Sequence, residues 1–240
     1  MTELSDTQLR ENLDAVTERI RNAEAEAGRE RGSVQLLPVT KFHDVSVIRV
    51  LADAGITLVG ENREQEARAK AEALAADAVT CGIAMIGQIQ SKKANAVARW
   101  ASEVHSLDSV KLATGLDRGM ALALERGDRT TDRLPCLIQV SADGDTSRGG
   151  VSLAELDPLI DATEQATHLI LDGFMVVPPL DANPDDVFSQ IRRLTDTYTE
   201  KLGRRLRFSA GMSGDFERAI AHGSDVVRVG TAVCGPRPVG

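Results

Sequence analysis

The 240-residue sequence predicts a single (β/α)8 barrel that spans residues 1–240 and carries an extra helix at its N-terminus. Short apolar runs alternate with helical patterns, which is typical of right-handed βαβ units and a parallel sheet. Eight units of about 30 residues each match the usual size of this barrel. A doubly wound open sheet is the alternative, but no GxGxxG motif follows the first apolar run.

The first helix is predicted over residues 7–29, where apolar residues recur at spacings of three and four. Runs rich in branched apolar residues predict strands buried on both faces, at residues 34–40, 57–60, 83–87, 104–107, 134–140, 169–177, 206–210 and 226–230. Helices are predicted between them, at residues 45–54, 62–75, 91–100, 109–125, 153–163, 185–201 and 214–221. Because only 3% of residues are aromatic, we expect Val, Ile and Leu to fill the barrel interior.

The composition argues against several classes of protein. No apolar stretch approaches the roughly 18 residues of a membrane span, and the polar, acidic N-terminus does not resemble a secretory signal. We therefore expect a cytoplasmic protein. The net charge of -8 argues against a nucleic-acid or anionic membrane surface, so the expected ligand is small. Three widely spaced cysteines fit neither a disulfide set nor a metal cluster and are expected to be small core residues: Cys81, Cys136 and Cys234.

Polar residues gather where the predicted strands end, and active sites of such barrels form at the C-terminal ends of the strands. Lys41 ends the first predicted strand and Asn62 follows the second. A lysine at this rim can be partly desolvated, which lowers its pKa and frees the amine to attack a carbonyl carbon. The alternative for Lys41 is an ordinary solvated lysine. Asn62 is either a helix N-cap or a contact to a ring hydroxyl of the ligand.

Two loops at the same rim could hold a phosphate. Ser213 lies in the turn 211–215, which opens a predicted helix, and Gly230 and Thr231 follow the eighth strand. An N-cap role is the alternative for Ser213. Arg228, within the eighth strand, forms either a structural salt bridge or a contact with a ring nitrogen, which it would keep unprotonated. An amine and two phosphate loops in one site predict pyridoxal 5′-phosphate, which carries both an aldehyde and a phosphate.

The four histidines have no metal-ligand spacing, and we assign none of them a catalytic role: His43, His105, His168 and His222. Only His43 lies near the predicted mouth.

An ordered set of motifs resembles the pyridoxal phosphate homeostasis proteins, the YggS-like or PROSC family. The motifs are LPVTK at 37–41, GENREQE at 60–66, IGQIQSKK at 86–93, HSLDS at 105–109, SRGG at 147–150, MVVPP at 175–179, GMSGD at 211–215 and RVGTA at 228–232. The resemblance implies a barrel similar to the N-terminal domain of alanine racemase, with the cofactor linked to Lys41. It also implies that Asn62 and Met212 line the cofactor, that Arg228 faces the pyridine nitrogen, and that the phosphate is held by Ser213, Gly230 and Thr231.

Three positions depart from the family pattern. Ala84 stands where the family often has histidine, Lys92 where it has asparagine, and Arg63 where an aromatic residue is usual. The resemblance implies a monomer in vitamin B6 homeostasis, which buffers the cofactor or delivers it transiently to apo enzymes without robust turnover.

Two enzymes remain as alternatives. An amino-acid racemase needs a second base, typically a tyrosine, and a closing C-terminal domain. The only tyrosine, Tyr198, falls in a predicted outer helix, and the sequence ends nine residues after Thr231. An aldolase would use Lys41 against a sugar phosphate and would stay colourless until its substrate arrives.

Overall fold

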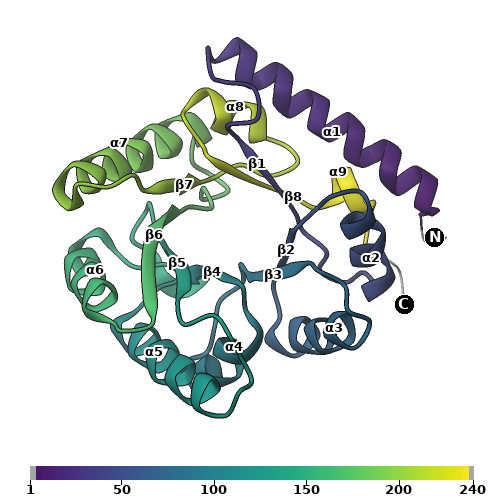
Figure 1. The fold of residues 1–240 in the computed structure, drawn as a ribbon. Coiled ribbons are helices and arrows are strands. Elements are labelled where there is room, and N and C mark those ends of the chain that lie inside the picture. The colour runs from purple at the N-terminus through teal and green to yellow at the C-terminus, as the bar shows by residue number, and fades with distance from the viewer. Residues whose placement is uncertain (1–3, 238–240) are drawn as a thin grey trace.

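A ring of eight parallel strands surrounded by helices forms the core of the protein (Figure 1). The computed structural model describes residues 4–237. Its strands are β1 (Gln35–Pro38), β2 (Leu58–Glu61), β3 (Gly82–Met85), β4 (Glu103–Leu107), β5 (Leu134–Gln139), β6 (Leu169–Met175), β7 (Arg207–Ser209) and β8 (Val226–Val229).

The sheet is nearly closed. Its order runs β1-β8-β7-β6-β5-β4-β3-β2, and β1 pairs in parallel with β8. Between β1 and β2, a parallel bridge joins Val39 to Gly60, and the Thr40 N–H donates to the Gly60 carbonyl at 3.0 Å. The prediction of a (β/α)8 barrel is confirmed, and an open sheet is excluded.

Each predicted helix is present, although several ends differ. The helices are α1 (Asp6–Glu26), α2 (Val45–Asp53), α3 (Glu64–Ala76), α4 (Ala94–Trp100), α5 (Val110–Glu125), α6 (Leu156–Gln165), α7 (Pro184–Leu202), α8 (Phe216–Ala221) and α9 (Thr231–Cys234). The short α9 was not predicted, and short 3₁₀ turns precede α4 and α6. Among residues 4–237, no helix combines the length and the apolar character needed to cross a bilayer.

The helix α1 covers the side of the barrel where β8 and β1 meet. The four-residue α9 that follows β8 is too short to cover these strands. Instead α1 packs against α2, α8 and α9 (Figure 1). The apolar residues that predicted this helix are its buried face: Leu9, Leu13, Val16, Ile20 and Ala23. They share an apolar cluster with Val227 and Val229 of β8.

The half of the barrel interior nearer the N-terminal ends of the strands, called the lower half below, contains charged side chains. The expectation that Val, Ile and Leu fill the interior is wrong there. Arg207 of β7 donates to Asp172 of β6 at 2.5 Å, to Glu103 of β4 at 2.8 Å and to Gln35 of β1 at 3.2 Å. One side chain can reach three other strands only across the inside of the ring. Glu103 also lies 2.7 Å from the fully buried His105.

The charges of this interior cluster compensate one another. Burial lowers the pKa of His105 below its ordinary value, and Glu103 opposes that change only in part. Burial by itself would raise the pKa of Glu103, but the His105 hydrogen bond and the Arg207 charge outweigh it and lower that pKa. Above this layer the interior is apolar, formed by Leu37, Leu58, Ala84, Val226 and the half-buried Ile86.

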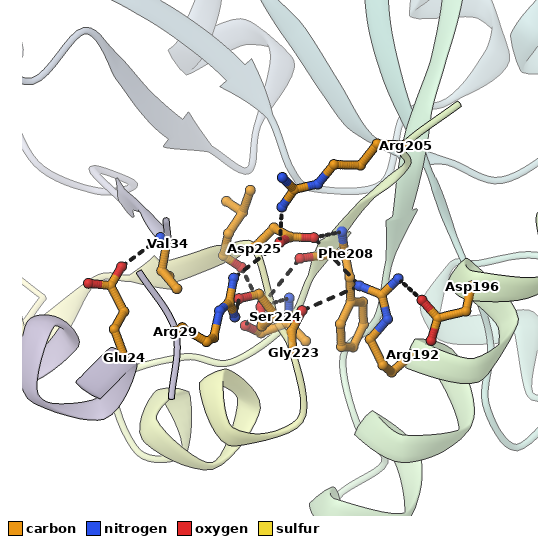
Figure 2. Close-up of polar contacts among 12 residues, drawn as sticks. Glu24, Arg29, Val34, Arg192, Asp196, Arg205, Phe208, Gly223, Ser224 and Asp225 are labelled. Atoms are coloured by element: carbon orange, nitrogen blue, oxygen red, sulfur yellow. Dashed lines mark hydrogen bonds and ion pairs between the residues drawn. The ribbon is translucent and has the colours of Figure 1, made fainter. Parts of the chain in front are cut away.

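A second ionic cluster lies at the N-terminal ends of β7 and β8, and Figure 2 shows its polar contacts. Asp225, just before β8, is 7% exposed and lies 2.9 Å from Arg205 and 3.2 Å from Arg29. Arg192 of α7 approaches the same carboxylate to 3.6 Å, and the Phe208 N–H donates to it at 2.9 Å. A single carboxylate thus ties the segment after α1, helix α7 and strand β7 to the start of β8.

We predict that Asp225→Asn lowers the free energy of unfolding by roughly 3 kcal/mol, because it leaves several guanidinium groups without their shared anion. Urea denaturation followed by circular dichroism measures this loss. The control is Asp53→Asn, since that side chain is 75% exposed and lies 3.9 Å from Arg10. We expect the control to change stability by less than about 0.5 kcal/mol, and equal losses in the two variants would contradict the prediction.

Candidate functional site

A cavity of about 390 Å³ opens at the C-terminal ends of the strands. Small-molecule sites typically have roughly 300 to 1,000 Å³. The wall contains every residue that the sequence predicted for the site: Lys41, Asn62, Met212, Ser213, Arg228, Gly230 and Thr231. The structure therefore brings these residues together from four separate segments of the chain. His43 lines the same cavity.

The charge of the cavity wall is the opposite of the charge of the chain. The sequence has 36 acidic and 28 basic residues, yet no Asp or Glu is among the described residues that line this cavity. The wall does contain three cationic side chains, those of Lys41, Arg228 and Arg237. Such a wall favours an anionic ligand.

The backbone that carries Lys41 is held from behind by Lys70 of α3, which is only 6% exposed. The Lys70 ammonium donates to the Thr40 carbonyl at 3.0 Å and to the Glu61 carboxylate at 2.7 Å. The Thr40 hydroxyl donates to the same Glu61 oxygen at 2.6 Å. These contacts fix the residue that precedes Lys41.

The residue that follows Lys41 is fixed by the same group of side chains. The Phe42 N–H donates to Glu66 at 2.7 Å, and Lys70 donates to this carboxylate at 2.9 Å. Phe42 has a φ of 69°, a left-handed conformation that is unfavourable for a residue with a side chain. Contacts on both sides of Lys41 therefore compensate for a strained backbone and direct its side chain into the cavity.

The two carboxylates bound by Lys70 differ in their pKa shifts. Burial raises the pKa of Glu61, and the hydrogen bonds from Lys70 and Thr40 reverse only part of this. Burial acts in the same direction on Glu66, but bonds from Lys70 and the Phe42 N–H outweigh it, so the pKa of Glu66 is lowered. The sequence did not predict this network. The i,i+4 spacing of Glu66 and Lys70 was visible in the sequence, but the burial of Lys70 was not.

Two loops supply unpartnered backbone donors to the cavity. Within residues 4–237, the N–H groups of Ser213, Gly214, Gly230 and Thr231 have no hydrogen-bond acceptor, and all four residues line the cavity. The hydroxyls of Ser213 and Thr231 lie on the same wall. Four free amides and two hydroxyls form a suitable cradle for phosphate oxygens.

The turn that carries Ser213 differs from its expected form. The helix α8 begins at Phe216, with Asp215 as its N-cap residue, so the alternative of Ser213 as an N-cap is wrong. The Asp215 carboxylate accepts from the Met212 N–H at 2.7 Å and so stabilises the turn. Gly211 has a φ of 92°, and a Cβ atom there would lie 2.8 Å from the Phe216 Cα, so the turn requires glycine at this position.

Arg228 lines the cavity from within the sheet and is 4% exposed. Its guanidinium donates to the Ser209 hydroxyl at 2.7 Å and to the Val176 carbonyl at 2.9 Å. No carboxylate in the described chain lies within salt-bridge distance, so the salt-bridge alternative is wrong. Burial lowers the pKa of Arg228 to about 10, and the charge of Asp215 opposes the shift, so the group stays cationic at neutral pH.

Asn62 and the three positions that depart from the family pattern lie in different parts of the structure. Asn62 lines the cavity and is not the N-cap of α3, because Arg63 holds that position. Of the positions that depart from the family pattern, Ala84 is buried in the apolar layer of the barrel interior. Arg63 lines a neighbouring depression beside α3, and Lys92 lies in the 3₁₀ turn Ser91–Lys93.

Comparison with known proteins assigns the family. Residues 12–238 match the family model described as the N-terminal domain of alanine racemase. A relative from Corynebacterium glutamicum, named pyridoxal phosphate homeostasis protein, is 56% identical over 89% of this chain and 95% of its own length. The chain belongs to the pyridoxal phosphate homeostasis protein family. A member of this family from Mycobacterium tuberculosis is 40% identical over 97% of this chain and 94% of its own length.

Solved structures agree with the assignment to this family. A structure described as an unknown protein from Bifidobacterium adolescentis has a TM-score of 0.84 at 32% identity, and the match covers 97% of this chain and 98% of that one. PipY of Synechococcus elongatus, solved with PLP bound, has a TM-score of 0.79 at 30% identity, over 95% of this chain and 100% of PipY. Alanine racemase from C. glutamicum, at 18% identity, a TM-score of 0.65 and coverage of 95% of this chain and 62% of the racemase, shares the fold alone.

We predict that Lys70→Met destabilises the protein by about 2 to 3 kcal/mol at pH 8, because it leaves Glu61 as a buried carboxylate without a cation. A carboxyl with a raised pKa in the folded state stabilises at low pH, and this stabilisation is lost as the pH rises through the folded pKa. Removing Lys70 raises that pKa further and also removes a bond that lowers the pKa of Glu66. The destabilisation should therefore be smaller at pH 5 than at pH 8.

Urea unfolding of both proteins at the two pH values measures the difference. Lys111→Met is the matched control, because Lys111 is exposed on α5. The control should leave stability within about 0.5 kcal/mol at either pH. A Lys70→Met loss that is independent of pH would show that Glu61 does not titrate as inferred.

Proposed function

We propose that this chain binds pyridoxal 5′-phosphate in the cavity at the strand ends and serves intracellular vitamin B6 homeostasis without robust catalytic turnover. The observation that carries the proposal is one acid-free cavity that combines Lys41, a cradle of free amides and a buried guanidinium. The names of the relatives and the PLP bound to PipY support the same cofactor. We propose that the whole chain, residues 1–240, acts as one cofactor-binding unit in the cytoplasm.

The cavity residues divide between the two ends of the cofactor. Lys41 Nζ would add its lone pair to the aldehyde carbon, lose two hydrogens, and release the aldehyde oxygen as water, which leaves an internal aldimine. Ser213, Gly230 and Thr231 would hold the phosphate, and Arg228 would face the pyridine nitrogen. Asn62 and Met212 would line the ring between these ends. The bound cofactor supplies an electrophilic aldehyde and an electron sink.

The remaining side chains favour a carrier over a racemase. Arg228 is cationic and cannot accept a proton, so it would leave the pyridine nitrogen unprotonated and the electron sink weak. Tyr198, the only tyrosine, lies on α7 and donates to Asp157. Burial and Asp157 raise the pKa of Tyr198 to about 12, which makes it unsuited to proton exchange near neutral pH. We propose a monomer that meets apo enzymes only transiently.

Lys41→Ala tests the covalent link. The wild-type protein should turn yellow with pyridoxal 5′-phosphate, and borohydride should fix the cofactor on Lys41, which mass spectrometry of the peptide detects. The variant should neither colour nor retain cofactor after reduction. Lys92→Ala, a change of another lysine on a turn outside the cavity, should behave as the wild type. A wild type that stays colourless would refute cofactor binding and would favour the aldolase.

Turnover distinguishes the carrier from the racemase. The loaded wild type should not interconvert the enantiomers of alanine at a rate that depends on Lys41. Steady interconversion that Lys41→Ala abolishes would replace the proposal with a racemase.

A further inference from the structure

Arg237 reaches the cofactor cavity from the segment that follows α9. Its guanidinium carbon lies 4.1 Å from the centre of the Phe42 ring, which is within the range of a cation–π contact. Both residues line the cavity beside Gly230 and Thr231. The segment is fixed just before Arg237, because the Gly235 N–H donates to the Thr231 carbonyl at 3.0 Å. Its position next to the proposed cradle is therefore set by α9.

Arg237 has no anionic partner in the described chain. Of the three cationic side chains in the wall, Lys41 is committed to the aldehyde in the proposed function, and Arg228 is bonded to Ser209 and Val176. No hydrogen bond or ion pair to residues 4–237 engages the Arg237 guanidinium, which only stacks on Phe42. The amide cradle on the same wall carries no formal charge that could neutralise a phosphate dianion.

We propose that Arg237 binds the phosphate of the cofactor and makes the site selective for phosphorylated over unphosphorylated pyridoxal. This inference rests on the proposed function and adds a residue that the sequence motifs do not include. Phe42 holds the guanidinium at the cavity while the fork of N–H donors stays available, and a guanidinium matches phosphate oxygens in charge and geometry. The same ring thus links the backbone next to Lys41 to the cation that meets the phosphate.

Arg63 provides a matched control. It also stacks on Phe42, with 5.1 Å between its guanidinium carbon and the ring centre, but it lines the depression beside α3 and not the cofactor cavity. Removing either arginine removes one cation from the same ring, yet only Arg237 is in the wall of the cofactor cavity. A general electrostatic effect would therefore change both variants alike, whereas a phosphate contact would change one.

The experiment measures the dissociation constants of pyridoxal 5′-phosphate and pyridoxal for the full chain and for Arg237→Gln, Arg237→Lys and Arg63→Gln, by visible absorbance. Arg237→Gln should raise the dissociation constant of pyridoxal 5′-phosphate at least about tenfold. It should change the dissociation constant of pyridoxal by less than about twofold. Arg237→Lys should recover part of the loss, because it keeps the charge but not the fork. Inorganic phosphate should compete with the cofactor in the wild type and less in Arg237→Gln, whereas Arg63→Gln should match the wild type.

Three results would overturn the inference. Equal weakening of both ligands in Arg237→Gln would show that Arg237 supports the fold or the ring, and unchanged affinity for both would show that it does not contact the phosphate. Similar losses in Arg63→Gln and Arg237→Gln would indicate a general field. A wild type that binds neither ligand would refute the proposed function itself, which separates the two failures.

Discussion

The hydrogen bonds and ion pairs of the buried Lys70 ammonium are the interactions on which the site depends most. This ammonium joins the carboxylates of Glu61 and Glu66 to the Thr40 carbonyl, and through them it fixes the backbone on both sides of Lys41. Breaking a buried ion pair is costly because the surviving charge cannot return to water. The contacts of Lys70 and Glu66 therefore hold Phe42, whose backbone is strained, at the mouth of the barrel. Helix α3 has a role in the site although only its preceding loop reaches the cavity wall.

The barrel interior changes character from one end to the other. Compensated charges around Arg207 lie at the lower end, an apolar layer follows, and uncompensated cations line the mouth. The apolar layer lies between Arg228 and the carboxylates around Arg207. In the described chain, Arg228 has only neutral hydrogen-bond partners. Positive charge is thus preserved where an anion can enter, in a chain that is negative overall.

The sequence predicted the parts of the structure that repeat. The spacing of Leu9, Val16 and Ile20 determines which face of α1 is buried, and the alternation of apolar runs with helical patterns determines the barrel, because both follow from local periodicity. The rule that sites form at strand ends then placed all seven site residues in one cavity. Contacts between distant segments could not be predicted in this way. No pattern in the sequence indicates the contacts of Arg207 and Lys70, and no motif connects Arg237 with Phe42.

Helix α1 also constrains the order in which the chain can fold. The Asn12 side-chain amide donates to the Val233 carbonyl at 3.1 Å, across 221 residues of sequence, and β1 completes its pairing only with β8. Contacts of such long range form late, since the entropy of closing the loop must be overcome first. On the ribosome, several βα units can thus form before the loop at Gly230 and Thr231, which follows β8, has been synthesised. The cavity wall includes these two residues and Arg237, so it can be complete only after they have been synthesised.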